Sequence, residues 1–70
     1  MNINDLNAEI ARQGYSKPQL ASKMGISKKR LYSRLKGNTA FRQEEIQMIA
    51  SILHLDSDKI MNIFFAELVS

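Results

Sequence analysis

The chain has 70 residues, of which 44% are apolar and 24% charged, and a formal net charge of +3, which is the composition of a folded domain too short for two separate cores. It has no cysteine and a single histidine, which excludes disulfides, thiolate metal sites and a histidine zinc site, so no metal and no cofactor are expected. No apolar run approaches the roughly 20 residues that cross a bilayer, and the first residues lack a secretory signal, so we expect one domain, residues 1–70, in the cytoplasm and outside any membrane.

Two helices are predicted in the first third of the chain. Apolar residues recur at helical spacing over residues 3–13, and Gly14 follows where a helix-ending residue is expected. Ser16 offers an N-cap for a second helix at residues 17–24, and Gln19 completes the pattern of a capping box three positions later. The sequence therefore predicts two short helices separated by a tight connection.

A third helix is predicted almost directly after the second. Gly25 tolerates the left-handed conformation that ends a helix, and Ser27 can cap a helix at residues 28–36. Leu31 and Leu35 lie one turn apart and mark the buried face of this helix. Its remaining faces are polar and basic.

The second half of the chain predicts two more helices and no strand. Apolar residues at helical spacing define one helix at residues 42–53 and another at residues 57–66. Glu44 and Glu45 are interpreted as acidic residues that favour the N-terminal dipole of the first of these helices. Three methionines are interpreted as packing in or near the core: Met24, Met48 and Met61. The expected fold is all-α, a compact domain of five helices.

The most specific pattern of the chain is the segment at residues 20–27, with the sequence LASKMGIS. Two helices joined so tightly must cross steeply, and Ala21 leaves room where their backbones approach. Gly25 accepts the conformation of the turn, and Leu31 fills the wedge between the helices. This is the pattern of a helix-turn-helix unit, whose second helix has dimensions that fit the major groove of B-DNA.

The segment resembles the phage repressor/Cro helix-turn-helix family, also called XRE-like, whose fold is that of the lambda repressor DNA-binding domain. A later stretch shares the family's pattern for its fourth and fifth helices: Gly37, Asn38, Phe41, Glu45, Ile46, Ile49, Ala50, Leu53 and Leu55. The resemblance covers most of the chain. Arg34 departs from it, because many members carry an apolar residue there, and Leu35 is expected to take over the packing role.

The helix at residues 28–36 is the expected DNA-reading helix. With Leu31 and Leu35 facing inward, a rotation of about 100° per residue points Lys29, Ser33 and Lys36 outward. The resemblance implies the positions that contact DNA bases, with the first of them contacting a base or a phosphate: Lys17, Lys28, Lys29, Tyr32 and Ser33. Lysine can donate to guanine, serine can serve several bases, and a tyrosine ring can pack on a thymine methyl group.

Charge is distributed unevenly along the chain. Nine of the ten lysines and arginines lie between Ile10 and Gln43, a stretch that contains none of the seven acidic residues. Such a block predicts a surface that binds a polyanion, with a merely solvated charged face as the alternative. We expect DNA phosphate contacts from two helix N-termini and from the edges of this surface: Ser16, Ser27, Arg30, Lys36, Asn38, Thr39 and Arg42.

The segment at residues 60–69 holds more apolar side chains than one face of a short helix can bury. One stripe is expected to close the core, which leaves Phe65, Leu68 and Val69 as a dimer or partner surface. A two-fold homodimer is the usual arrangement for this motif, because a symmetric pair reads half-sites about one helical turn apart. A frayed tail or a purely intramolecular core is the alternative.

The sequence thus predicts a sequence-specific regulator of transcription, of Cro or repressor type, that binds a palindromic operator in double-stranded DNA at the nucleoid of a bacterial or phage-infected cell. The alternative is an antirepressor or modulator that acts by binding a second repressor protein. His54 is interpreted as a helix-end residue, because no cysteine, paired carboxylates or ordered Ser/Asp set accompanies it. No enzymatic activity and no catalytic residue are expected.

Overall fold

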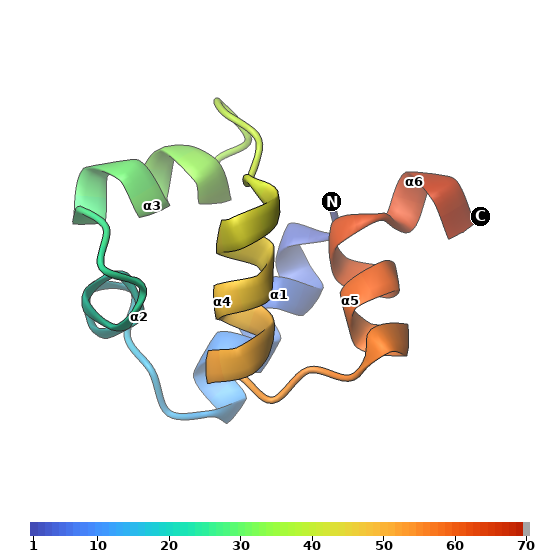
Figure 1. The fold of residues 1–70 in the computed structure, drawn as a ribbon, viewed down its shortest axis with the longest axis horizontal. Helices are drawn as coiled ribbons and strands as arrows, with labels where there is room; N and C mark the ends of the chain where they lie inside the picture. The colour runs from blue at the N-terminus through green and yellow to red at the C-terminus, as the bar shows by residue number, and fades with distance from the viewer. Residues whose placement is uncertain (70) are drawn as a thin grey trace.

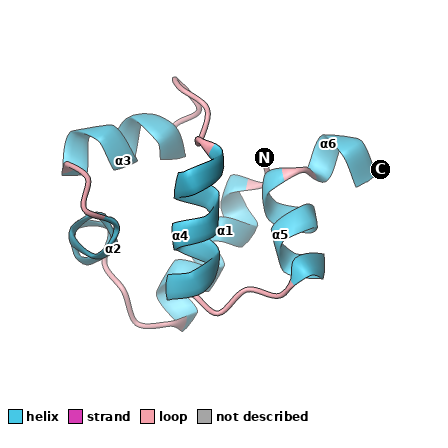
Figure 2. Ribbon diagram, in the orientation of Figure 1, coloured by secondary structure: helices cyan, strands magenta, loops and turns pink. Residues whose placement is uncertain are grey.

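The computed structural model describes residues 1–69, with the backbone alone for Val69, and these residues form six helices and no strand (Figure 1, Figure 2). The helices are α1 (Ile3–Arg12), α2 (Lys17–Met24), α3 (Lys28–Leu35), α4 (Gln43–Ile52), α5 (Ser57–Phe64) and α6 (Ala66–Val69). The expectation of an all-α fold is confirmed. The longest connection is the loop at residues 36–42, which joins α3 to α4.

Side-chain caps start α1, α2, α3 and α5. In each case the side chain just before the helix accepts a hydrogen bond from the backbone N–H three residues later, and the caps are Asn2, Ser16, Ser27 and Asp56. At α2 the Gln19 side chain also accepts from the backbone N–H of Ser16 at 2.9 Å, which completes the capping box. These bonds satisfy backbone donors that have no partner within the helix.

The segment expected as one helix at residues 57–66 is interrupted at Phe65. Phe65 leaves the helical conformation, with φ −124° and ψ 34°, although its N–H still donates to the Met61 carbonyl. The break allows the Phe65 side chain to pack partly against the core, and the chain resumes as the single turn of α6. An ion pair between the Glu67 carboxylate and the amino group of Met1 joins α6 to the start of the chain.

The core is assembled from an apolar face of each of the first five helices. Its largest fully buried side chains come from α1 to α4 and the residue after α4: Leu6, Leu20, Leu31, Ile49 and Leu53. From α5, Phe64 closes the core by meeting Phe41 edge to face, with ring centroids 5.6 Å apart. Met24 is buried as expected, but Met48 and Met61 are 41% and 42% exposed and do not pack against the core, so their interpretation as core or near-core residues was wrong.

Helices α2 and α3 are joined by a three-residue turn, Gly25 to Ser27, and their axes cross steeply (Figure 1). Gly25 has φ +74°, a conformation that L side chains rarely adopt, and the following Ile26 N–H donates to the Ala21 carbonyl at 3.1 Å. Because α2 packs against both α3 and α4, α3 is fixed at one edge of the molecule. This geometry is that of a helix-turn-helix unit.

Candidate nucleic-acid interface

Helix α3 has one buried side and one exposed side. The buried side consists of Leu31, Arg34 and Leu35. Lys28 and Lys29 are exposed at the start of the helix, and Tyr32 is 38% exposed one turn later. The two leucines therefore face inward as the sequence predicts, and the basic and aromatic side chains are open to a partner.

The five residues expected to contact bases differ in their exposure to solvent. Lys17, Lys28, Lys29 and Tyr32 are exposed on α2 and α3. Ser33 is half-buried, and its hydroxyl lies 3.3 Å from the Thr39 hydroxyl in the α3–α4 loop. The loop thus covers part of the helix side on which Ser33 was expected to face outward.

The seven residues expected to contact phosphates are all exposed: Ser16, Ser27, Arg30, Lys36, Asn38, Thr39 and Arg42. The hydroxyls of Ser16 and Ser27 accept from backbone N–H groups as helix caps, at 3.2 and 3.1 Å, and each keeps its own proton to donate. The start of α3 therefore combines a partial positive charge with two adjacent lysines, a combination suited to an anion.

A surface hollow brings residues of α2 and α3 together. Its volume is about 410 Å³, and it is lined by Asn7, Lys17, Tyr32, Leu35 and Lys36. Two lysines and a phenol at the rim of one concave surface can receive a phosphate group, since all three side chains donate hydrogen bonds. Lys17 and Lys36, which are 19 residues apart in the sequence, thus contribute to the same surface.

A buried ion pair that the sequence did not predict joins α3 to α4. Arg34 is 7% exposed and Glu45 is 4% exposed, and Nε of Arg34 donates to Oε1 of Glu45 at 2.6 Å. The Arg42 N–H donates to the same oxygen at 2.8 Å, which caps the start of α4. Glu45 was interpreted only as a dipole-favouring acid, and that account was incomplete. The available signal was an arginine at a position where the resemblance expects an apolar residue.

The surroundings of Glu45 favour its ionised form. Burial opposes ionisation, but the hydrogen bonds from the Arg42 backbone and the Arg34 side chain, together with the charges of Arg34 and Arg30, outweigh it and hold the pKa of Glu45 below its usual value. The pair is therefore charged at neutral pH. Removing either side chain would leave a buried charge without its partner, which would lower the free energy of unfolding.

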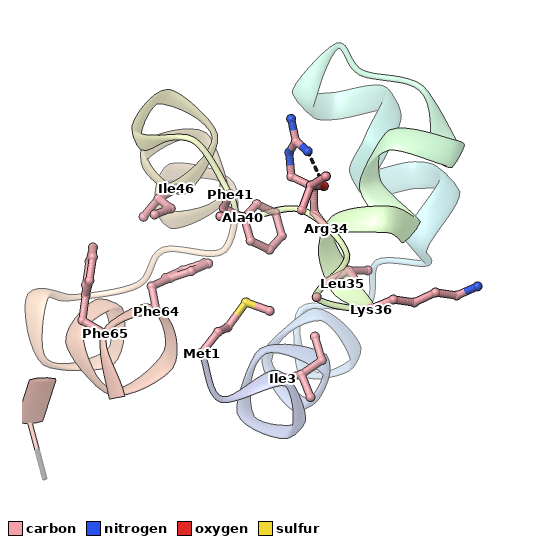
Figure 3. A pocket seen from close by; sticks show the side chains of 12 residues that line it. Met1, Ile3, Arg34, Leu35, Lys36, Ala40, Phe41, Ile46, Phe64 and Phe65 are labelled. Carbon is pink, nitrogen blue, oxygen red and sulfur yellow. Dashed lines mark hydrogen bonds between the residues drawn. The ribbon is translucent and has the colours of Figure 1, made fainter. Parts of the chain in front are cut away.

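The expected partner surface at the C-terminal end is open in part. Phe65 is half-buried, Leu68 is 78% exposed, and the side chain of Val69 lies outside what the structure describes. Phe65 lines two neighbouring cavities, of about 560 and 550 Å³, and both of them also include Phe41 and Ile46. Figure 3 shows Phe41 and Phe64 pointing into the first cavity, whereas Lys36 extends away from it. We refer to Phe41, Ile46, Phe65 and Leu68 as the apolar surface.

Comparison of the chain with family models, with curated proteins and with solved structures gave no match. Over residues 1–69, no helix has the length and apolar character needed to cross a membrane. The same residues include no cluster of three or more side chains arranged to hold a metal ion. The functional interpretation therefore depends on the geometry of α3 and its surroundings.

Proposed function

We propose that the protein is a sequence-specific DNA-binding regulator of transcription, of the repressor/Cro type, in which α3 enters the major groove. One observation carries the proposal: α3 buries Leu31 and Leu35 and leaves Lys28, Lys29 and Tyr32 exposed on its other side. A helix held at the edge of a helix-turn-helix unit fits into the major groove, where lysine side chains can donate hydrogen bonds to guanine.

The charge of the unit supports this proposal. Residues 17–35, which comprise α2, the turn and α3, contain no aspartate or glutamate. Six basic side chains flank or lie on the exposed side: Lys17, Lys28, Lys29, Arg30, Lys36 and Arg42. A surface of one sign attracts the phosphate backbone at long range and holds it by counterion release. The protein would act at the nucleoid, in the cytoplasm of a bacterial or phage-infected cell.

We further propose that two copies bind an operator with two-fold symmetry through the apolar surface. Leu68 is 78% exposed, and the cavities beside Phe65 offer apolar walls for a side chain of that kind. The same surface supports the second candidate function, in which the protein binds a different repressor and modulates it. The two candidates differ in whether the isolated protein recognises DNA.

The deciding experiment is selection of duplexes from a random-sequence pool by the purified protein, followed by titration of the enriched duplex at several salt concentrations. A regulator of this type enriches a defined motif and binds it about a thousandfold or more tightly than a scrambled duplex. Binding that is equal for both duplexes, or that requires a second protein, would favour the modulator instead.

A further inference from the structure

The buried carboxylate of Glu45 contacts α3 through two of its arginines, Arg34 and Arg30. Its Oε1 is occupied by Arg34 Nε at 2.6 Å and by the Arg42 N–H at 2.8 Å. Its Oε2 is buried without a hydrogen-bond partner among the described residues and lies 3.5 Å from Nε of Arg30. One carboxylate therefore restrains two arginines of α3, one buried and one exposed.

Arg34 extends this restraint to the surface. Its Nη1 donates to the Thr39 hydroxyl at 2.7 Å, a bond drawn in Figure 3, and the Thr39 hydroxyl lies 3.3 Å from that of Ser33. The two hydroxyls share one hydrogen bond, so whichever of them donates, one hydroxyl proton stays available for an outside acceptor. The contacts thus connect Glu45, at the start of α4, to Ser33, one of the α3 residues expected to contact a base.

We infer that Glu45 is a positioning residue for sequence recognition: through Arg34 and Arg30 it fixes how Ser33, Thr39 and Arg30 meet the DNA. This inference rests on the proposed function. Glu45 itself is 4% exposed, so a duplex cannot reach its carboxylate. Fixed hydrogen-bond donors discriminate between base pairs better than mobile ones, because a wrong base then leaves a donor unsatisfied.

Charge alone predicts the opposite effect of removing this carboxylate. Glu45→Gln deletes a negative charge beside a DNA-binding surface and releases Arg30, so a purely electrostatic role would tighten binding to every duplex. A positioning role predicts weaker binding to the preferred sequence and unchanged or tighter binding to an unrelated one. The ratio of the two affinities therefore separates the explanations.

The test compares wild type with Glu45→Gln on two probes: the duplex most enriched by the wild type and a scrambled duplex of equal length and base composition. We expect the affinity ratio to fall by about tenfold or more, the effect of losing one base contact. Glu44→Gln is the matched control, because Glu44 is the exposed neighbour on the same turn of α4 and makes the same charge change. It should tighten binding to both probes alike and leave the ratio unchanged.

A second variant covers the case in which Glu45→Gln does not fold, as judged by circular dichroism. Thr39→Val leaves the buried pair intact and removes the hydroxyl between Arg34 and Ser33. The inference requires this variant to lower the affinity ratio too, whereas equal losses on both probes mean that Thr39 is only a phosphate contact and overturn it. If wild type selects a sequence and Glu45→Gln keeps the wild-type ratio, this inference alone fails. If wild type selects no sequence, the proposed function fails and takes this inference with it.

Discussion

Among the residues that the structure describes, four that follow helices have a positive φ, and only one of them, His54, is not a glycine. Comparing His54 with Gly25 shows what this conformation costs a residue that has a side chain. Gly25 has φ +74° at the end of α2, and a Cβ built there would meet nothing within 4 Å, so backbone conformation alone favours glycine. His54 has φ +54° after α4, where the next N–H, of Leu55, donates to the Ala50 carbonyl at 2.9 Å. The first position is relaxed and the second is strained.

This difference predicts opposite effects of two substitutions on the free energy of unfolding. Gly25→Ala should destabilise the protein by about 1 kcal/mol, because alanine resists the left-handed conformation. His54→Gly should be neutral to stabilising by about 1 kcal/mol, since the relief of strain exceeds the added freedom of the unfolded chain. Urea denaturation followed by circular dichroism measures both, and a loss of stability in His54→Gly would contradict the account.

Lys29 and Arg42 are both exposed, but we expect them to contribute to DNA binding in different ways. Lys29→Ala should weaken binding by about 1–3 kcal/mol and relax the preference at a single base pair, as loss of a base contact does. Arg42→Ala should weaken binding to all sequences alike and reduce the slope of affinity against salt by about one. Gel-shift titrations against singly substituted operators would refute the assignment if the two variants behaved the same.

Some features of this surface follow from residue patterns and others do not. The spacing of Leu31 and Leu35 was enough to orient α3, because helical geometry fixes which side chains share a face. The half-burial of Ser33 was not predictable in this way, since the α3–α4 loop that covers it follows no periodic pattern. The role of Arg34 was not predictable either, because its partner, Glu45, lies 11 positions later in the chain.

At the scale of helices, the pair formed by Arg34 and Glu45 joins α3 to α4. The residues are 11 positions apart, and the α3–α4 loop must fold back before they meet. Helix propensity explains why an acid suits the first turn of α4, but only the packing of α4 against the helix-turn-helix unit brings that acid inside. Helices α3 and α4 were therefore predictable from the sequence, but the ion pair that joins them was not.

The ion pair predicts how stability depends on pH. The pKa of Glu45 is held below its usual value, so its contribution to stability is complete above about pH 4.3 and is lost as the pH falls through the lowered pKa. Glu45→Gln should reduce the free energy of unfolding by about 3 kcal/mol at pH 7, because it leaves the buried guanidinium of Arg34 without its counter-charge. Between about pH 5 and pH 3 the free energy of unfolding of Glu45→Gln should fall less steeply than that of wild type.

The matched control for this prediction is again Glu44→Gln, which makes the same charge change at the exposed neighbouring position. Glu67, whose pKa is lowered by its hydrogen bond to the amino group of Met1, remains in all three proteins and cancels in the comparison. Urea titrations repeated at several pH values provide the measurement. Parallel pH profiles for wild type and Glu45→Gln would mean that the pair contributes no acid-sensitive stability.

At the scale of the molecule, packing within a single chain does not account for the exposed apolar residues of the C-terminal segment. Leu68 stands on α6, one turn beyond Phe65, while α3 lies towards the opposite end of the molecule in Figure 1. Composition and periodicity predicted an excess of apolar residues in this segment. They did not predict the break at Phe65, because that break depends on how one aromatic ring packs against the folded core.

Leu68→Lys is the variant that tests whether the apolar surface joins two copies. Because the side chain is 78% exposed in the single chain, the substitution should change the stability of the monomer by less than about 0.5 kcal/mol. It should shift a dimer towards monomer in sedimentation experiments, since a buried unpaired ammonium group is costly. Gln13→Lys, at an exposed position after α1, is the control for the added charge. Identical sedimentation of both variants and wild type would exclude Leu68 from an interface.

The placement of α3 and α6 on different parts of the fold has a consequence for the cell. If association uses α6 and operator recognition uses α3, both can occur at once, and occupancy of the operator rises with roughly the square of protein abundance where monomer predominates. Halving the concentration, as happens when a cell doubles its volume without new synthesis, then lowers a low occupancy about fourfold. Such a regulator would release its gene abruptly on dilution, with no small-molecule inducer.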